Sequence, residues 1–199
     1  MVRLLASGGI GSGKSYVISI FNALGVPSYN ADGRAKGLYD TDAGLLADVV
    51  DAAGEDVLRD GRLDRRVLAS KIFSSDSLRS RIEALVHPAV MRDFERWCAG
   101  QTASVVIMES AILMEHPELL AQMDCSLCVV APLETRIDRV MFRDGCTRKQ
   151  ALDRISCQWS DARRMELADF IIENDGVQAL LPQIMNILET LNNKENGKD

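Results

Sequence analysis

The chain has 199 residues, a formal net charge of −6, 47% hydrophobic residues and 26% charged residues. This composition is ordinary for a globular protein, and the acidic balance argues against a general nucleic-acid-binding protein. No apolar run approaches the roughly 20 residues that cross a bilayer, and a strand pattern starts too early to leave room for a signal peptide. We therefore expect a cytoplasmic protein, monomeric or weakly homo-oligomeric, that binds neither nucleic acid nor membranes.

The first predicted strand, residues 2–6, runs into the glycine-rich segment 8–15, Gly-Gly-Ile-Gly-Ser-Gly-Lys-Ser. This segment fits the phosphate-loop pattern G-x-x-x-x-G-K-[ST] between a strand and a helix. Such loops turn successive backbone N–H groups toward phosphate oxygens, and the following helix points its positive end there. Lys14 is expected to reach the β- and γ-phosphates of ATP, and Ser15 to offer its hydroxyl to Mg²⁺. The residues expected to bind ATP here are Gly9, Gly11, Ser12, Gly13, Lys14, Ser15 and Tyr16.

The helix that follows the loop is predicted to run from Lys14 to about Leu24, where Gly25 ends it. The spacing of apolar residues, and the positions of glycines, prolines and capping residues, predict the remaining elements. Helices are expected at 41–53 (capped by Thr41), 65–73, 77–99 (kinked or divided at Pro88), 134–144, 147–158, 160–168 and 178–191, strands at 26–29, 104–109, 126–131 and 170–172, and a turn-rich connection at 54–64.

Strands alternating with helices predict an α/β fold, a phosphate-loop NTPase core with a five-stranded parallel sheet flanked by helices. Two strand-poor stretches are expected to be helical insertions beyond the carboxyl ends of strands, where such folds bind substrates. The expected nucleotide-binding core comprises residues 1–32, 101–139 and 166–192, with a helical substrate domain at 33–100, a helical lid at 140–165 and a flexible tail at 193–199.

Two carboxylates follow predicted strands and are candidates for phosphoryl-transfer chemistry. Asp32 could accept a proton from, or position, an acceptor hydroxyl, or it could merely cap a helix. Glu109 could act on Mg²⁺ through water, or it could be satisfied by backbone N–H groups.

Three arginines, Arg136, Arg139 and Arg143, share one face of a predicted helix. Guanidinium groups stabilise the charge that develops on a transferring phosphoryl group, although such a stripe can also be a solvated basic face. His87 taken alone is more typical of a structural histidine. Cys125 and Cys128 form a C-x-x-C inside a predicted strand, which favours buried hydrophobic packing over a metal site.

Taken together, these segments resemble the dephospho-coenzyme A kinase family from about residue 3 to about residue 190. The loop alone is common to many kinases, whereas its combination with the other motifs is much more specific. The matching motifs are the loop at 8–15, Asn-Ala-Asp at 30–32, Arg-Arg-Val-Leu at 65–68, Ile-Phe at 72–73, His-Pro at 87–88, Ala-Ile-Leu-Met-Glu at 111–115, the lid segment at 139–158 and Ala-Asp-Phe-Ile-Ile-Glu-Asn-Asp-Gly at 168–176.

The resemblance implies transfer of the ATP γ-phosphate to the ribose 3′-hydroxyl of dephospho-CoA. It makes Asp32 the catalytic base or hydroxyl positioner and residues 33–100 the CoA-side domain. The roles it implies are catalytic for Lys14, Asp32, Arg139 and Arg143, ATP binding for Asn174, and acceptor binding for Asp32, Lys36, His87 and Glu115.

Four positions depart from the family pattern: Tyr16 for Thr, Asn30 for Asp, Lys36 for Arg, and Ala111 for Pro. Two other functions stay open at this point: a kinase for another small metabolite or nucleoside monophosphate, and a non-catalytic nucleotide-dependent switch. The guanine-reading N-K-x-D element of GTPase switches is absent from the sequence.

Overall fold

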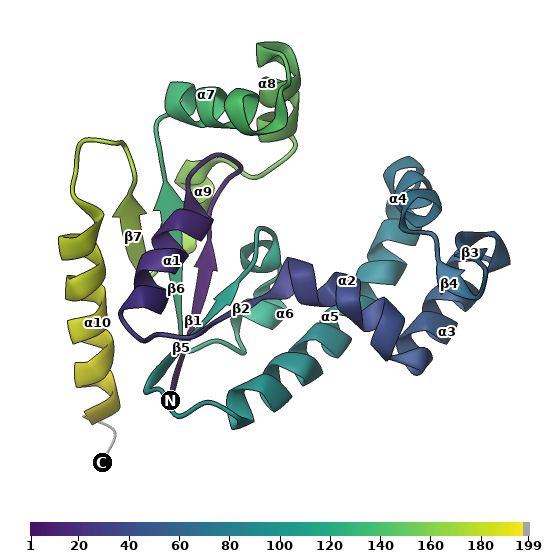
Figure 1. The fold of residues 1–199 in the computed structure, drawn as a ribbon, viewed down its shortest axis with the longest axis horizontal. Coiled ribbons are helices and arrows are strands. Elements are labelled where there is room, and N and C mark those ends of the chain that lie inside the picture. Colours follow the sequence, from purple (N-terminus) through teal and green to yellow (C-terminus); the bar gives the residue numbers. More distant parts are fainter. Residues whose placement is uncertain (197–199) are drawn as a thin grey trace. The chain divides into compact units, whose positions relative to one another are not determined.

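The computed structural model describes residues 1–196, and its largest sheet confirms the predicted α/β fold. All neighbouring strands in this sheet pair in parallel, in the order β2-β5-β1-β6-β7 (Figure 1). The central strands are buried along almost their whole length because helices cover both faces. The strands are β1 (Val2–Ser7), β2 (Ser28–Asn30), β5 (Val105–Glu109), β6 (Cys125–Val130) and β7 (Phe170–Glu173).

The chain divides into two compact units. The first contains Met1–Asn30 and the chain from Gln101 onward, and the second is Ala31–Gly100. The second unit is therefore inserted between β2 and β5, which are neighbours in the sheet. Its elements are α2 (Ala31–Thr41), α3 (Ala43–Ala53), η1 (Glu55–Val57), β3 (Leu58–Arg59), β4 (Arg62–Leu63), α4 (Arg65–Ser74) and α5 (Asp76–Ala99).

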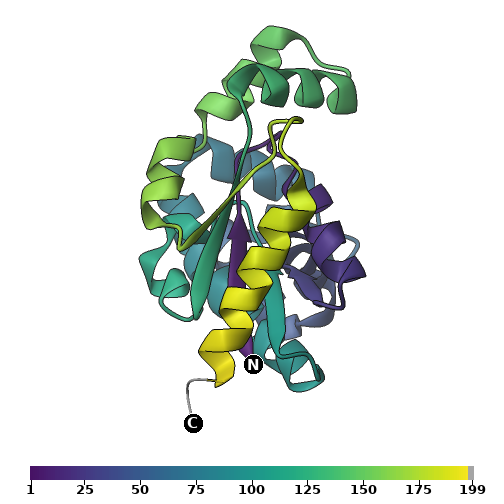
Figure 2. The same ribbon diagram turned by 90° about the vertical axis from the view of Figure 1, so that its left-hand side faces the viewer.

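One face of the five-stranded sheet is covered by α1 (Lys14–Ala23) and α10 (Leu180–Asn196), the latter yellow in Figure 2. Buried side chains such as Phe21 and Ile184 pack with the apolar residues of the strands in a single core cluster. The first unit also contains η2 (Leu113–Glu115), α6 (Pro117–Leu120) and α9 (Asp161–Leu167), which packs against β6. The sheet is thus a rigid platform whose carboxyl edge presents the phosphate loop.

A helical hairpin of α7 (Leu133–Asp144) and α8 (Arg148–Ser156) lies beyond the carboxyl ends of β1 and β6 (Figure 1). Gly145 ends α7 in the left-handed conformation, and Thr147 and Gln150 form a capping box at the start of α8. The hairpin has its own small apolar core of Ile137, Val140 and Ala151, against which Ile10 of the phosphate loop packs. The predicted lid region is therefore attached to the loop by side-chain packing.

Several predicted boundaries are wrong. Thr41 is the last residue of α2, and Asp42 caps α3 by accepting a hydrogen bond from the Leu45 amide. Pro88 lies inside α5 without dividing it. The expected turn-rich connection contains the β3–β4 hairpin, whose turn has Asp60 at φ 52°.

The ends of the sheet and of the chain also differ from expectation. The second strand begins at Ser28 instead of residue 26. Helix α10 continues to Asn196, beyond the expected end at 191 and into the expected tail. Residues 197–199 of that tail lie outside the described residues.

The C-x-x-C pair is buried in β6, as predicted. Burial raises the pKa of the Cys128 thiol to about 11, so the group stays neutral at physiological pH. Among residues 1–196, no helix combines the length and the apolar character that crossing a membrane requires.

Candidate active site

The phosphate loop connects β1 to α1 and presents a row of unused backbone donors. Gly13 precedes α1 at φ 86°, a left-handed conformation, and a Cβ there would collide with the Asn174 side-chain amide. Within residues 1–196, the backbone N–H groups of Gly11, Gly13, Lys14 and Ser15 have no hydrogen-bond acceptor. A cluster of such donors at a helix N-terminus is a ready site for an anion.

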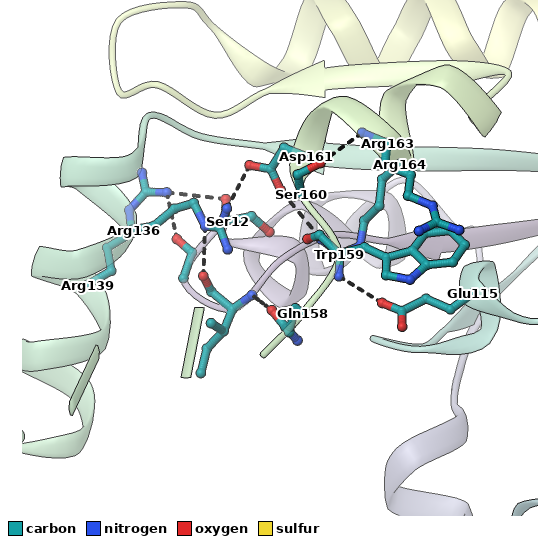
Figure 3. Close-up of polar contacts among 12 residues, drawn as sticks. Ser12, Glu115, Arg136, Arg139, Gln158, Trp159, Ser160, Asp161, Arg163 and Arg164 are labelled. Carbon is teal, nitrogen blue, oxygen red and sulfur yellow. Dashed lines mark hydrogen bonds and ion pairs between the residues drawn. The ribbon is translucent and has the colours of Figure 1, made fainter. Parts of the chain in front are cut away.

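The carbonyl groups of the same loop are held by side chains from outside it. Arg136 Nε donates to the Ile10 carbonyl at 2.9 Å, and Asn174 Nδ2 donates to the Ser12 carbonyl at 2.8 Å. Arg139 Nη1 donates to the carbonyls of Gly11 and Ser12 at 3.3 and 3.2 Å (Figure 3). Because these carbonyls are bound from outside, the loop is held in one conformation.

Glu109, at the end of β5, joins the loop to the strand beside it. Its Oε1 accepts from Lys14 Nζ at 3.0 Å and from Ser15 Oγ at 2.9 Å, and its Oε2 accepts from Asn30 Nδ2 at 3.2 Å. Glu109 is buried, and its carboxylate is compensated by the Lys14 ammonium group. The sequence named Glu109 as a candidate for acting on Mg²⁺, but its pairing with Lys14 was not anticipated.

A pocket of about 480 Å³ opens over the loop within the first unit. Lys14 and Ser15 line it together with Tyr16, a residue that is 63% exposed. The residues that line it are Gly8, Gly9, Ile10, Gly11, Gly13, Lys14, Ser15, Tyr16, Ala111, Arg139, Arg143 and Gln158. All the predicted loop residues except the buried Ser12 thus line one cavity together with Arg139 and Arg143, whereas Asn174 does not line it.

The three arginines of α7 have different environments. Arg136 is buried, whereas Arg139 lines the pocket and also donates to the Asn174 carbonyl at 3.1 Å. Arg143 is more exposed and forms a two-point ion pair with Asp144, whose hydrogen bonds raise the pKa of the Arg143 guanidinium. The three arginines therefore differ in their contacts: Arg136 binds the loop, Arg139 lines the pocket, and Arg143 pairs with Asp144.

Asp32, Lys36 and His87 belong to the second unit. Asp32 lies exposed in the first turn of α2, two residues after Asn30, and the exposed Lys36 follows one turn later. His87 lies half-buried in α5 before Pro88.

Glu115 lies in the first unit, and its Oε1 accepts from Arg164 Nη2 at 3.1 Å (Figure 3). Sequence reasoning missed three residues around the loop: Gln158, Asp161 and Arg164. Gln158 binds the Ile10 amide, Asp161 binds Arg136, and Arg164 is fully buried. Gln158 falls in the lid segment of the resemblance, but nothing in the spacing of the three pointed to the loop.

A family model and curated relatives name the same family. The sequence model of the dephospho-CoA kinase family matches residues 3–179. A dephospho-CoA kinase of Bacteroides fragilis is 37% identical over 194 residues, covering 97% of this chain and 94% of the relative. A crystal structure of a Thermus thermophilus protein superposes with a TM-score of 0.83 at 30% identity, covering 95% and 96% of the two chains.

A solved dephospho-CoA kinase from Campylobacter jejuni shares the fold, with a TM-score of 0.64 at 21% identity and coverage of 99% and 98%. A parallel sheet, a glycine-rich loop with Lys14 and Ser15, and the α7–α8 hairpin beyond the sheet have the fold of a P-loop kinase. Within that class, the chain belongs to the dephospho-CoA kinase family.

Proposed function

We propose that this protein transfers the γ-phosphate of ATP to the ribose 3′-hydroxyl of dephospho-CoA and so completes coenzyme A synthesis. The observation that carries the donor half is the set of four open backbone donors at Gly11, Gly13, Lys14 and Ser15, residues that all line one pocket. Membership of the dephospho-CoA kinase family supports the acceptor half.

In this proposal the loop binds the phosphates of ATP. The N–H groups of Gly11, Gly13, Lys14 and Ser15 donate to phosphate oxygens, and the ammonium group of Lys14 neutralises the β- and γ-phosphates. Arg139 and Arg143, which line the pocket, stabilise the charge on the transferring group. Phosphoryl transfer relies mainly on such positioning and charge stabilisation.

The residues beside Lys14 fit a magnesium ion. Mg²⁺ prefers oxygen ligands and is commonly held by one or two protein oxygens together with phosphates and water. Ser15 Oγ and the Glu109 carboxylate supply such oxygens 2.9 Å apart, next to the loop. When bound, the ion would neutralise charge on the phosphates, with Ser15 as ligand and Glu109 as ligand or as acceptor from its water.

Asp32 is our proposed catalytic base or hydroxyl positioner. It follows β2 at the carboxyl edge of the sheet, where parallel-sheet folds bind substrates. Lys36, His87 and Glu115 are proposed acceptor-side residues on the basis of the family motifs that they match.

The decisive experiment measures ADP release by the purified protein with ATP, Mg²⁺ and dephospho-CoA. We expect ADP and coenzyme A in equal amounts, with little ADP from a panel of nucleoside monophosphates. Equal turnover with another acceptor would reassign the substrate. ADP release that is independent of any acceptor would instead indicate a nucleotide switch.

Substituting Asp32 separates a chemical role from a structural one. We expect Asp32→Asn to lower kcat by about 10²-fold or more while the Kd for ADP stays unchanged, because the carboxylate acts on the acceptor hydroxyl. Asp48→Asn, at an exposed position of α3, is the matched control and should retain full kcat. A kcat within about threefold of wild type in Asp32→Asn would refute the base assignment.

A further inference from the structure

Four charged side chains of alternating sign form a network of ion pairs that reaches the phosphate loop: Glu115, Arg164, Asp161 and Arg136 (Figure 3). Nitrogen–oxygen distances between successive members are 3.1, 3.6 and 2.8 Å. The side chain of Arg164 is 0% exposed and that of Arg136 is 6% exposed. The ion-pair network therefore runs through the interior, from the segment after β5 to α7.

The ion-pair network ends at Ile10 of the phosphate loop, and three contacts hold this residue. Arg136 Nε donates to the Ile10 carbonyl at 2.9 Å, and the Ile10 amide donates to Gln158 Oε1 at 2.8 Å. The Ile10 side chain packs against the apolar core of the lid. Ile10 is thus fixed by residues that lie more than a hundred positions later in the chain.

Arg164 holds the segment that supplies these contacts. Its Nη1 donates to the Trp159 carbonyl at 2.5 Å and lies 3.6 Å from Asp161 Oδ1. Trp159 directly follows Gln158, and Asp161 binds Arg136. A single guanidinium therefore fixes both the segment that carries Gln158 and the carboxylate that orients Arg136.

The arrangement is poorly suited to stability alone. Within residues 1–196, three buried atoms of the ion-pair network accept or donate no hydrogen bond: Arg136 Nη2, Asp161 Oδ1 and Arg164 Nε. Well-packed apolar side chains often stabilise a protein as much as a buried ion network does, or more. What apolar side chains could not supply is the orientation of donors and acceptors around Ile10.

Gly9 shows how closely Arg136 approaches the loop. A Cβ on Gly9 would collide with Arg136 Nη2 and Cζ, and the next glycine, Gly11, lies against the Arg136 backbone. Only a loop without side chains at these positions leaves room for Arg136 to approach this closely. The loop and Arg136 therefore constrain each other's position.

We propose that Arg164 is a positioning residue for ATP: through Trp159 and Asp161 it sets Gln158 and Arg136 on the two backbone groups of Ile10, which keeps the loop donors facing the pocket. The inference rests on the donor role of the loop proposed above. It assigns Arg164 no contact with the substrate, so its effect should appear in nucleotide affinity.

The test compares Arg164→Lys with the matched control Arg163→Lys, a change at the neighbouring, exposed arginine of α9 that stacks over the Trp159 ring. Lysine keeps the charge but loses the planar fork that contacts Trp159, Asp161 and Glu115 together. We expect the Kd for ADP, measured by calorimetry, and the KM for ATP to rise about tenfold or more in Arg164→Lys. Arg163→Lys should resemble wild type in both quantities.

A second pair of variants keeps the test decisive if Arg164→Lys folds poorly. Asp161→Asn should also raise the Kd for ADP, because it releases Arg136, and Gln158→Ala should raise it because it leaves the Ile10 amide without its acceptor. Lowered thermal stability with an unchanged Kd for ADP in the folded fraction of both variants would overturn the proposal while leaving the proposed function intact. Failure of the wild-type protein to bind ADP would refute the donor site itself and the proposal with it.

Discussion

Glu109 shows how much one side chain can connect. It accepts hydrogen bonds from Lys14, Ser15 and Asn30, so the loop, the first turn of α1 and the end of β2 meet at one carboxylate. The Asn30 side-chain amide donates to Glu109, whereas a second carboxylate would repel it.

Glu109→Gln tests the role of this carboxylate. A neutral amide neither balances Lys14 nor attracts Mg²⁺, so we expect kcat to fall by about 10²-fold or more. ADP affinity without Mg²⁺ should not weaken, because no buried carboxylate is left uncompensated when Lys14 turns to the phosphates, but the tightening of ADP binding by Mg²⁺ should be lost. Calorimetry with and without Mg²⁺ measures this difference, and Glu166→Gln, at an exposed position of α9, is the control. Normal Mg²⁺ dependence in Glu109→Gln would contradict the proposed metal site.

At the scale of elements, the sequence predicted what short-range patterns encode. The five strands and the helices α7 and α8 follow from apolar runs and capping residues, and Lys14 and Ser15 of the loop motif line the pocket. The hairpin β3–β4 was missed because its strands have only two residues each. Contacts such as Gln158 with Ile10 join residues 148 positions apart, and no local pattern encodes them.

The cap of α3 tests a prediction that failed. The Asp42 side chain accepts from the Leu45 amide, whereas the Thr41 hydroxyl donates back to the Gly37 carbonyl. We expect Asp42→Ala to lower the free energy of unfolding by about 1 kcal/mol, since an N-cap bond is lost. Thr41→Ala should change it by less than about 0.5 kcal/mol. Urea denaturation measures both, and equal effects would return the cap to Thr41.

At the scale of the whole molecule, global stability should depend on a thiol that has no part in the proposed chemistry. Cys128 is buried in β6, and desolvation, aided by the charge of Asp161, raises its pKa from 9.0 to about 11. Folding therefore favours the neutral thiol. Its contribution is fully present below pH 9 and is lost as the pH rises through about 11.

Alkaline denaturation of Cys128→Ala checks this linkage. The free energy of unfolding of wild type should fall more steeply between pH 9 and 11 than that of the variant, by up to about 1.4 kcal/mol per unit of pKa shift. The comparison uses the slope because removing the thiol also leaves a cavity. Cys157→Ala, at an exposed position, should follow wild type. Parallel slopes in Cys128→Ala and wild type would show that Cys128 ionises alike in the folded and unfolded chains.

In the proposed donor site, we expect the ion pair between Lys14 and Glu109 to couple the binding of nucleotide to that of Mg²⁺. When Lys14 turns to the phosphates, it leaves a buried carboxylate uncompensated, and a divalent ion at Ser15 and Glu109 would restore the balance. On binding, Mg²⁺ would then replace the Lys14 ammonium group beside Glu109, so that nucleotide and metal each raise the affinity for the other. By thermodynamic reciprocity, the factor by which Mg²⁺ tightens ADP must equal the factor by which ADP tightens Mg²⁺.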